Sequence, residues 1–85
     1  MAERQSVQER LFKAILYADL KSVKFCLENG AEINAKDKYD ENPLHNAALY
    51  GNLDIVKFLL ENGANINSKN GIGWSPLLIL EILKL

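Results

Sequence analysis

The chain repeats itself at a period of 33 residues, and this repeat limits its fold more than any other feature. Residues 20–36 align with residues 53–69, and 12 of the 17 aligned positions are identical. The match continues downstream, where Pro43-Leu44 recurs as Pro76-Leu77. Short tandem units cannot bury their apolar faces alone, so the repeat predicts a linear stack of units and not a domain around one core.

Each unit predicts two short helices followed by a loop, most clearly in the second copy. Asn42 can cap a first helix over residues 44–50, and Gly51 ends that helix. Asn52 caps a second helix with apolar residues at helical spacing, and Gly63 ends it. The first copy predicts helices over about residues 6–17 and 20–29.

Two positions depart from the glycine pattern of the turns. Ala18 stands where Gly51 stands one period later, and Asp40 stands where Gly73 does. Turns of this kind need a left-handed backbone, which costs an alanine about 1 kcal/mol and an aspartate less. If the backbone at Ala18 is left-handed, we therefore expect a small loss of stability there, and neither change is expected to prevent the fold.

The repeated motifs resemble those of the ankyrin repeat family. The resemblance covers about residues 11–80, and its residues occur in order at the family's spacing: Asn42-Pro43-Leu44-His45-Asn46-Ala47-Ala48, Gly51-Asn52-Leu53-Asp54 and Asn62-Gly63-Ala64. It implies an all-α repeat (solenoid) of helix-turn-helix pairs, stacked with β-turn finger loops and a concave surface that binds proteins.

The resemblance divides the chain into three units. Residues 1–36 are expected to form an N-terminal capping-type repeat, residues 37–69 a full repeat, and residues 70–85 a partial third repeat with its first helix only. This last unit ends in an apolar segment, Leu77–Leu85, which would expose core surface at the end of the stack. We favour the interpretation that the segment belongs to a longer array; dimerisation through it, or a helix that bends back over the stack, are the alternatives.

Composition argues against several classes of partner. The net charge of −1 provides no basic footprint for nucleic acid or an anionic membrane. We expect a cytoplasmic or otherwise intracellular protein, because residues 1–10 hold no apolar signal-peptide core and Cys26 is the only cysteine. Delivery into a host cell as an effector is left open.

No pattern of catalytic or metal-binding residues stands out. His45, the only histidine, has no nucleophile or carboxylate at a suitable spacing, and the resemblance gives it a hydrogen-bonding role between loops. Cys26 falls within the apolar stripe of a second helix, which predicts a small buried side chain. We therefore expect neither catalysis nor a cofactor or metal.

The predicted function is binding of a protein partner, at present unknown, through the finger loops and the inner face of the first helices. Six residues are the predicted contacts: Lys38, Tyr39, Glu41, Asn46, Tyr50 and Trp74. Trp74 could instead pack on the neighbouring finger, and this interpretation is slightly favoured. We expect Leu16 and Leu49 to pack between repeats, and Tyr17 and Tyr50 to form a ladder along the groove. The alternative function is a structural capping or spacer segment of a longer repeat protein.

Overall fold

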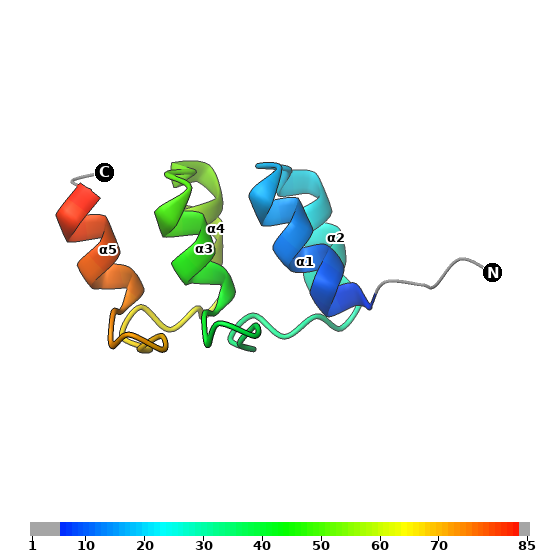
Figure 1. Ribbon diagram of the computed structural model, residues 1–85. Coiled ribbons are helices and arrows are strands. Elements are labelled where there is room, and N and C mark those ends of the chain that lie inside the picture. The colour runs from blue at the N-terminus through cyan, green and yellow to red at the C-terminus, as the bar shows by residue number, and fades with distance from the viewer. Residues whose placement is uncertain (1–5, 84–85) are drawn as a thin grey trace.

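The computed structural model describes residues 6–83, which form five helices and no strand. The helices are α1 (Val7–Leu16), α2 (Leu20–Glu28), α3 (Pro43–Leu49), α4 (Leu53–Glu61) and α5 (Pro76–Leu83). In Figure 1, α1, α3 and α5 stand side by side in one row, with α2 behind α1 and α4 behind α3. The long loops project together from one end of the rows. The predicted all-α repeat fold is confirmed.

The starts of the helices are fixed by polar side chains at their N-caps. The Oδ1 atom of Asn42 accepts the backbone N–H of His45 at 2.9 Å, and the Nδ1 atom of His45 accepts the N–H of Asn42 at 3.0 Å. One period away from each other, Asp19 and Asn52 cap α2 and α4 by accepting the backbone N–H of Ser22 and of Ile55. Each such cap contributes about 1 kcal/mol, and together they explain why such short segments begin where they do.

The turns have the left-handed backbone that the sequence predicts. The φ angle is 57° at Ala18 and 72° at Gly51, its counterpart one period later. In the finger loops it is 63° at Asp40 and 84° at Gly73. The two copies therefore turn in the same way even where the glycine has been replaced.

The core runs along the stack between the two rows of helices. Its largest fully buried apolar side chains are Leu11, Ile15, Val23, Cys26, Leu44, Ile55 and Leu59. The burial of Cys26 confirms its predicted place in the apolar stripe. The prediction that Leu16 and Leu49 pack between repeats is wrong, because both side chains are about half exposed and neither belongs to the apolar core or packs against it. The buried side of these helices is formed by other apolar side chains: Leu11, Ala14, Ile15, Leu44, Ala47 and Ala48.

Helix α5 continues the first row. It packs against α3 as α3 packs against α1, and its buried side chains are Pro76 and Ile79. Figure 1 shows α5 standing beside α3, so among the three predicted arrangements the helix that bends back over the stack is wrong. Lys84 and Leu85, at the end of the predicted apolar segment, lie outside the described residues.

Replacing Ala18 with glycine should stabilise the protein by about 1 kcal/mol, because glycine adopts a φ of 57° without a steric cost. The matched control is Gly51→Ala, which should cost a similar amount at the equivalent turn of the second copy. Urea unfolding followed by circular dichroism measures both changes. Equal stability of the Ala18→Gly variant and the parent would show that the left-handed turn at Ala18 carries no strain.

Candidate partner-binding surface

A hollow of about 340 Å³ lies between the inner faces of α1 and α3 and the first finger loop. We call it the inner groove. Aromatic, apolar, polar and charged side chains line it: Phe12, Lys13, Leu16, Asp37, Tyr39, Glu41, Asn46 and Tyr50. The groove is thus made by residues from three segments that only the stacking of repeats brings together.

Asp37 shapes the first finger. Its Oδ1 atom accepts the backbone N–H of Tyr39 at 2.8 Å and that of Glu41 at 3.0 Å. The N–H of Asp37 donates to the carbonyl oxygen of Glu41, and the N–H of Asp40 donates to that of Asp37. This closed turn places Tyr39 at the tip, where 65% of its surface is exposed.

The two fingers are bound to each other. Asn70 donates from its Nδ2 atom to Oε2 of Glu41 at 3.1 Å. Lys36 donates from Nζ to the carbonyl oxygen of Lys69 at 2.7 Å, and also lies 3.5 Å from a carboxylate oxygen of Asp40. These contacts hold the first finger in place against the second, so the groove wall is preformed.

His45 joins the core to the second finger. Its buried ring accepts the N–H of Asn42 at Nδ1, and its Nε2 atom lies 2.8 Å from the carbonyl oxygen of Trp74. Because a carbonyl oxygen only accepts, Nε2 carries the proton and Nδ1 does not. Both ring nitrogens are therefore engaged, and the loop-bridging role that the resemblance implied is confirmed.

The family model for ankyrin repeats (many copies) matches residues 27–79, which is more than half of the chain. The chain belongs to the ankyrin repeat family. None of the curated proteins compared with it matches. Ankyrin repeats in general mediate protein–protein interactions and are typically non-catalytic.

Four of the six predicted contact residues of this ankyrin stack come together in the inner groove: Tyr39, Glu41, Asn46 and Tyr50. Lys38 lies beside the groove, with its Nζ atom 5.1 Å from the centre of the Tyr39 ring. Trp74 does not line the groove, and its exposed side chain sits on the second finger. That these residues contact a partner stays a prediction, as do the intracellular location and the boundaries of the three units.

Four groove residues were not among the predicted contacts. Lys13 and Leu16 belong to the inner face of α1, whereas the sequence pattern did not point to Phe12 or to Asp37 of the first finger. Asp37 precedes the exposed Tyr39 by two residues, a spacing at which an aspartate side chain can bond to the backbone of a turn. That signal could have been read from the sequence. Phe12 is the counterpart of His45 one period earlier, and only the stacked structure places it at the groove.

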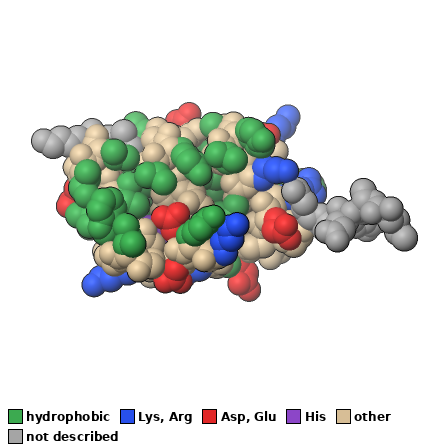
Figure 2. All heavy atoms as spheres, viewed as in Figure 1, with side chains coloured by type: hydrophobic (Ala, Val, Ile, Leu, Met, Phe, Trp, Pro, Cys, Tyr) green, Lys and Arg blue, Asp and Glu red, His purple; other side chains and the backbone are tan. Residues whose placement is uncertain are grey.

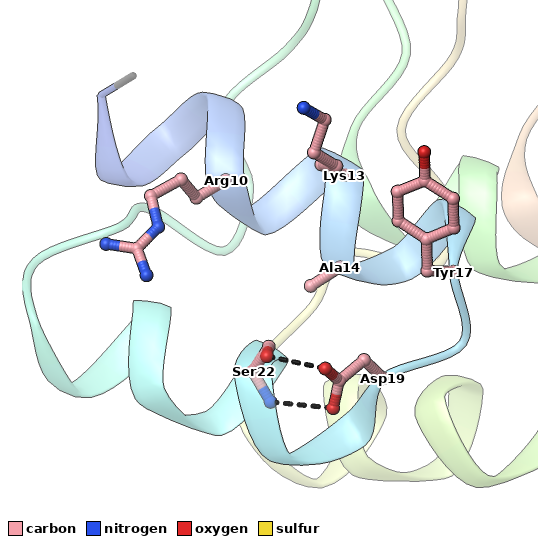
Figure 3. A pocket seen from close by; sticks show the side chains of 6 residues that line it. All are labelled: Arg10, Lys13, Ala14, Tyr17, Asp19 and Ser22. Carbon is pink, nitrogen blue, oxygen red and sulfur yellow. Dashed lines mark hydrogen bonds between the residues drawn. The ribbon is translucent and has the colours of Figure 1, made fainter. Parts of the chain in front are cut away.

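Tyr17 and Tyr50 line different hollows. Tyr50 lies in the inner groove, whereas Tyr17 borders a smaller hollow of about 170 Å³ between α1 and α2. In Figure 3 the side chains of Lys13 and Tyr17 point away from Asp19 and Ser22. The predicted tyrosine ladder therefore does not form the lining of one continuous groove.

The carboxylate of Asp19, which borders this smaller hollow, accepts hydrogen bonds from the first turn of α2. Ser22 donates to it twice, from its hydroxyl at 2.7 Å and from its backbone N–H at 3.2 Å, as the dashed lines in Figure 3 mark. The Ser22 hydroxyl is the largest cause that holds the pKa of Asp19 below its usual value, followed by the Ser22 N–H. The carboxylate therefore acts as an ionised helix cap.

The described residues 6–83 hold neither a metal-binding cluster nor a membrane-spanning helix. No group of three or more His, Cys, Asp or Glu side chains is arranged there to hold a metal ion. No helix in that range has the length and apolar character needed to cross a membrane.

The depressed pKa of Asp19 predicts an acid-dependent loss of stability. The folded protein binds this proton less readily than the unfolded chain, so the stabilisation is present above the unfolded value near 3.9 and disappears as the pH falls through the folded pKa. Asp19→Asn should lose less stability than the parent between about pH 5 and pH 2, because an amide does not titrate in this range. An asparagine can still cap the helix, as Asn52 does for α4.

The reciprocal variant Asn52→Asp should gain a similar acid dependence. Urea titrations at several pH values measure both variants. The interpretation fails if Asp19→Asn and the parent lose stability in parallel.

Proposed function

We propose that the inner groove binds a protein partner without catalysis. The observation that carries the proposal is the exposure of two tyrosine rings, Tyr39 at 65% and Tyr50 at 51%, in one hollow whose walls are fixed by hydrogen bonds. Tyrosine supplies a large contact area for few rotatable bonds, and is enriched among residues that dominate binding energy.

The preformed walls favour binding. Asp37 fixes the first finger from within, and Asn70 ties it to the second finger through Glu41. A partner that enters the groove therefore does not have to order these loops, which reduces the entropic cost of association. Lys13, Asp37 and Glu41 line the same hollow, so the groove offers charges of both signs beside its apolar and aromatic surface.

The absence of catalysis in this proposal is supported by the state of the two most reactive side chains. Cys26 is buried within the apolar core, and both ring nitrogens of His45 are taken by the backbone. Neither group is placed to meet a substrate.

The second candidate function is that of a capping or spacer segment in a longer repeat protein. The exposed apolar side chains of α5 favour it, because an inner repeat would bury that surface against a following unit. It differs from the first candidate in requiring no contact in the inner groove.

The double substitution Tyr39→Ala with Tyr50→Ala should weaken partner binding at least about tenfold, because it removes two exposed aromatic anchors and leaves the core unchanged. Affinity capture identifies the partner, and titration calorimetry with the purified partner measures the change. Tyr17→Ala is the matched control, since this tyrosine is 70% exposed but borders a different hollow. Affinities that stay equal across all three proteins would contradict the proposed use of the groove.

A further inference from the structure

One loop residue connects the two fingers through its side-chain amide. Asn70 is only 9% exposed, and its Oδ1 atom accepts the backbone N–H of Ile72 at 3.1 Å and that of Trp74 at 2.9 Å. Its Nδ2 atom donates to Oε2 of Glu41 on the first finger at 3.1 Å, a hydrogen bond that we call the latch. The oxygen of this amide therefore shapes the second finger, and the nitrogen ties that finger to the first.

The repeat shows which of these two roles requires an amide. The counterpart of Asn70 one period earlier is Asp37, whose Oδ1 atom accepts two backbone N–H groups of the first finger in the same pattern. A carboxylate is thus sufficient to shape a finger. An ionised carboxylate cannot donate a hydrogen bond, so only the latch needs the amide of Asn70.

A carboxylate at position 70 would turn the latch into a repulsion. The Nδ2 donor would become an oxygen within hydrogen-bond distance of the Glu41 carboxylate, and two negative charges this close repel each other. The Glu41 oxygen would also lose its hydrogen-bond donor. Both effects favour separation of the fingers.

The residue that follows makes this change chemically accessible, because asparagine is a labile residue when its neighbour is unhindered. Gly71 has no side chain to obstruct the approach of its backbone nitrogen to the carboxamide of Asn70. In the described part of the chain, the N–H of Gly71 donates no backbone hydrogen bond that would have to break first. Figure 2 shows charged side chains of both signs along the edge where the loops project in Figure 1, so water reaches the fingers.

The reaction needs only base and water. Base removes the proton from the nitrogen of Gly71, which attacks Cγ of Asn70 and closes a five-membered succinimide ring. The Cγ–Nδ2 bond breaks, and the nitrogen leaves as ammonia with the proton returned to it. Water then opens the ring, at Cγ to give aspartate, or at the backbone carbonyl carbon to give isoaspartate, in which the chain runs through Cγ.

The chain contains two other Asn-Gly pairs, and both are held by helix ends. Asn29 and Asn62 are the C-caps of α2 and α4, and the N–H of the glycine that follows each of them donates to a carbonyl oxygen of the helix. Their Nδ2 atoms donate to helix carbonyl oxygens as well. Asn70 instead lies in a finger whose residues 71–74 are all exposed, so a local opening of low free energy is sufficient to release it.

We propose that Asn70-Gly71 is a site of spontaneous deamidation, and that the product formed there releases the first finger from the second. An aspartate product keeps the turn and loses the latch, whereas isoaspartate loses both, because its backbone is one carbon longer. The effect on partner binding rests on the proposed function, since Glu41 lines the inner groove. The release of the fingers does not.

Incubation of the full chain in mildly alkaline buffer, followed by peptide mapping with mass spectrometry, locates the reaction. Deamidation should be several-fold faster at Asn70 than at Asn29 and Asn62. In urea the three sites should react at similar rates, because the preference comes from the fold. Gly71→Ala should slow the reaction at Asn70; the added Cβ would lie 3.5 Å from the carbonyl oxygen of Tyr39, an ordinary contact, so the loop is retained.

Asn70→Asp isolates the effect of the product on the fingers. At low salt, hydrogen exchange of the Tyr39 and Glu41 amides should become about tenfold faster, because a hydrogen bond to a charged group is lost. Adding Glu41→Gln should restore slow exchange, since the glutamine amide can donate to the new carboxylate and re-form the latch with its roles exchanged. Asn67→Asp, the same change at an exposed position of the same loop, is the matched control and should have no effect.

Two results would overturn the proposal. Deamidation of the folded chain at Asn29 or Asn62 that is as fast as at Asn70 would show that the finger protects its asparagine. Finger amides that exchange at the parent rate in Asn70→Asp would show that the latch does not hold the fingers together. Neither experiment uses a partner, so failure here is distinguishable from failure of the proposed function.

Discussion

The structure depends on the burial of α3 between its neighbours. This helix has only seven residues, a length at which an isolated helix is not stable in water. Six of the seven are buried, since α1, α4 and α5 all pack against it. The stability of α3 therefore comes from tertiary contacts. The same packing determines where the loops on either side of α3 begin and end.

Hydrogen bonds at the start of α3 fix the finger loops to this buried helix. The Asn42–His45 pair closes the start of the helix, and the other ring nitrogen of His45 reaches the backbone of Trp74 in the second finger. Asn46 lies on this short helix and Tyr50 is its C-cap, and both line the inner groove. The proposed binding surface is thus attached to the best-buried part of the molecule.

The repeat explains how much could be predicted. Because the copies repeat most of their turn and cap residues, the sequence was sufficient to place the first four helices to within a few residues and the fifth within residues 70–85. It also indicated Ala18 and Asp40 as the two positions where a left-handed turn would lack its glycine. Sequence identity between copies does not tell which side of a helix faces the core, and for this reason Leu16 and Leu49 were placed wrongly.

The groove was harder to predict than the helices. Four groove residues could be predicted from their places on a finger loop or on the inner face of a first helix: Tyr39, Glu41, Asn46 and Tyr50. The proximity of Phe12 to Asp37 could not, because stacking brings their two segments together. Trp74 was included because of its residue type, although the path of the second finger keeps it out of the groove lining. Contacts across repeats depend on the rotation from one unit to the next, which periodicity alone does not specify.

Native-state hydrogen exchange of the backbone amides tests most directly whether stability is centred on α3. Amides of α3 should exchange only through global unfolding, whereas those of α5, which has a neighbour on one side in the row, should exchange through local opening of lower free energy. Protection in α5 equal to that in α3 would contradict this account, and would mean that the end of the stack is as well supported as its centre.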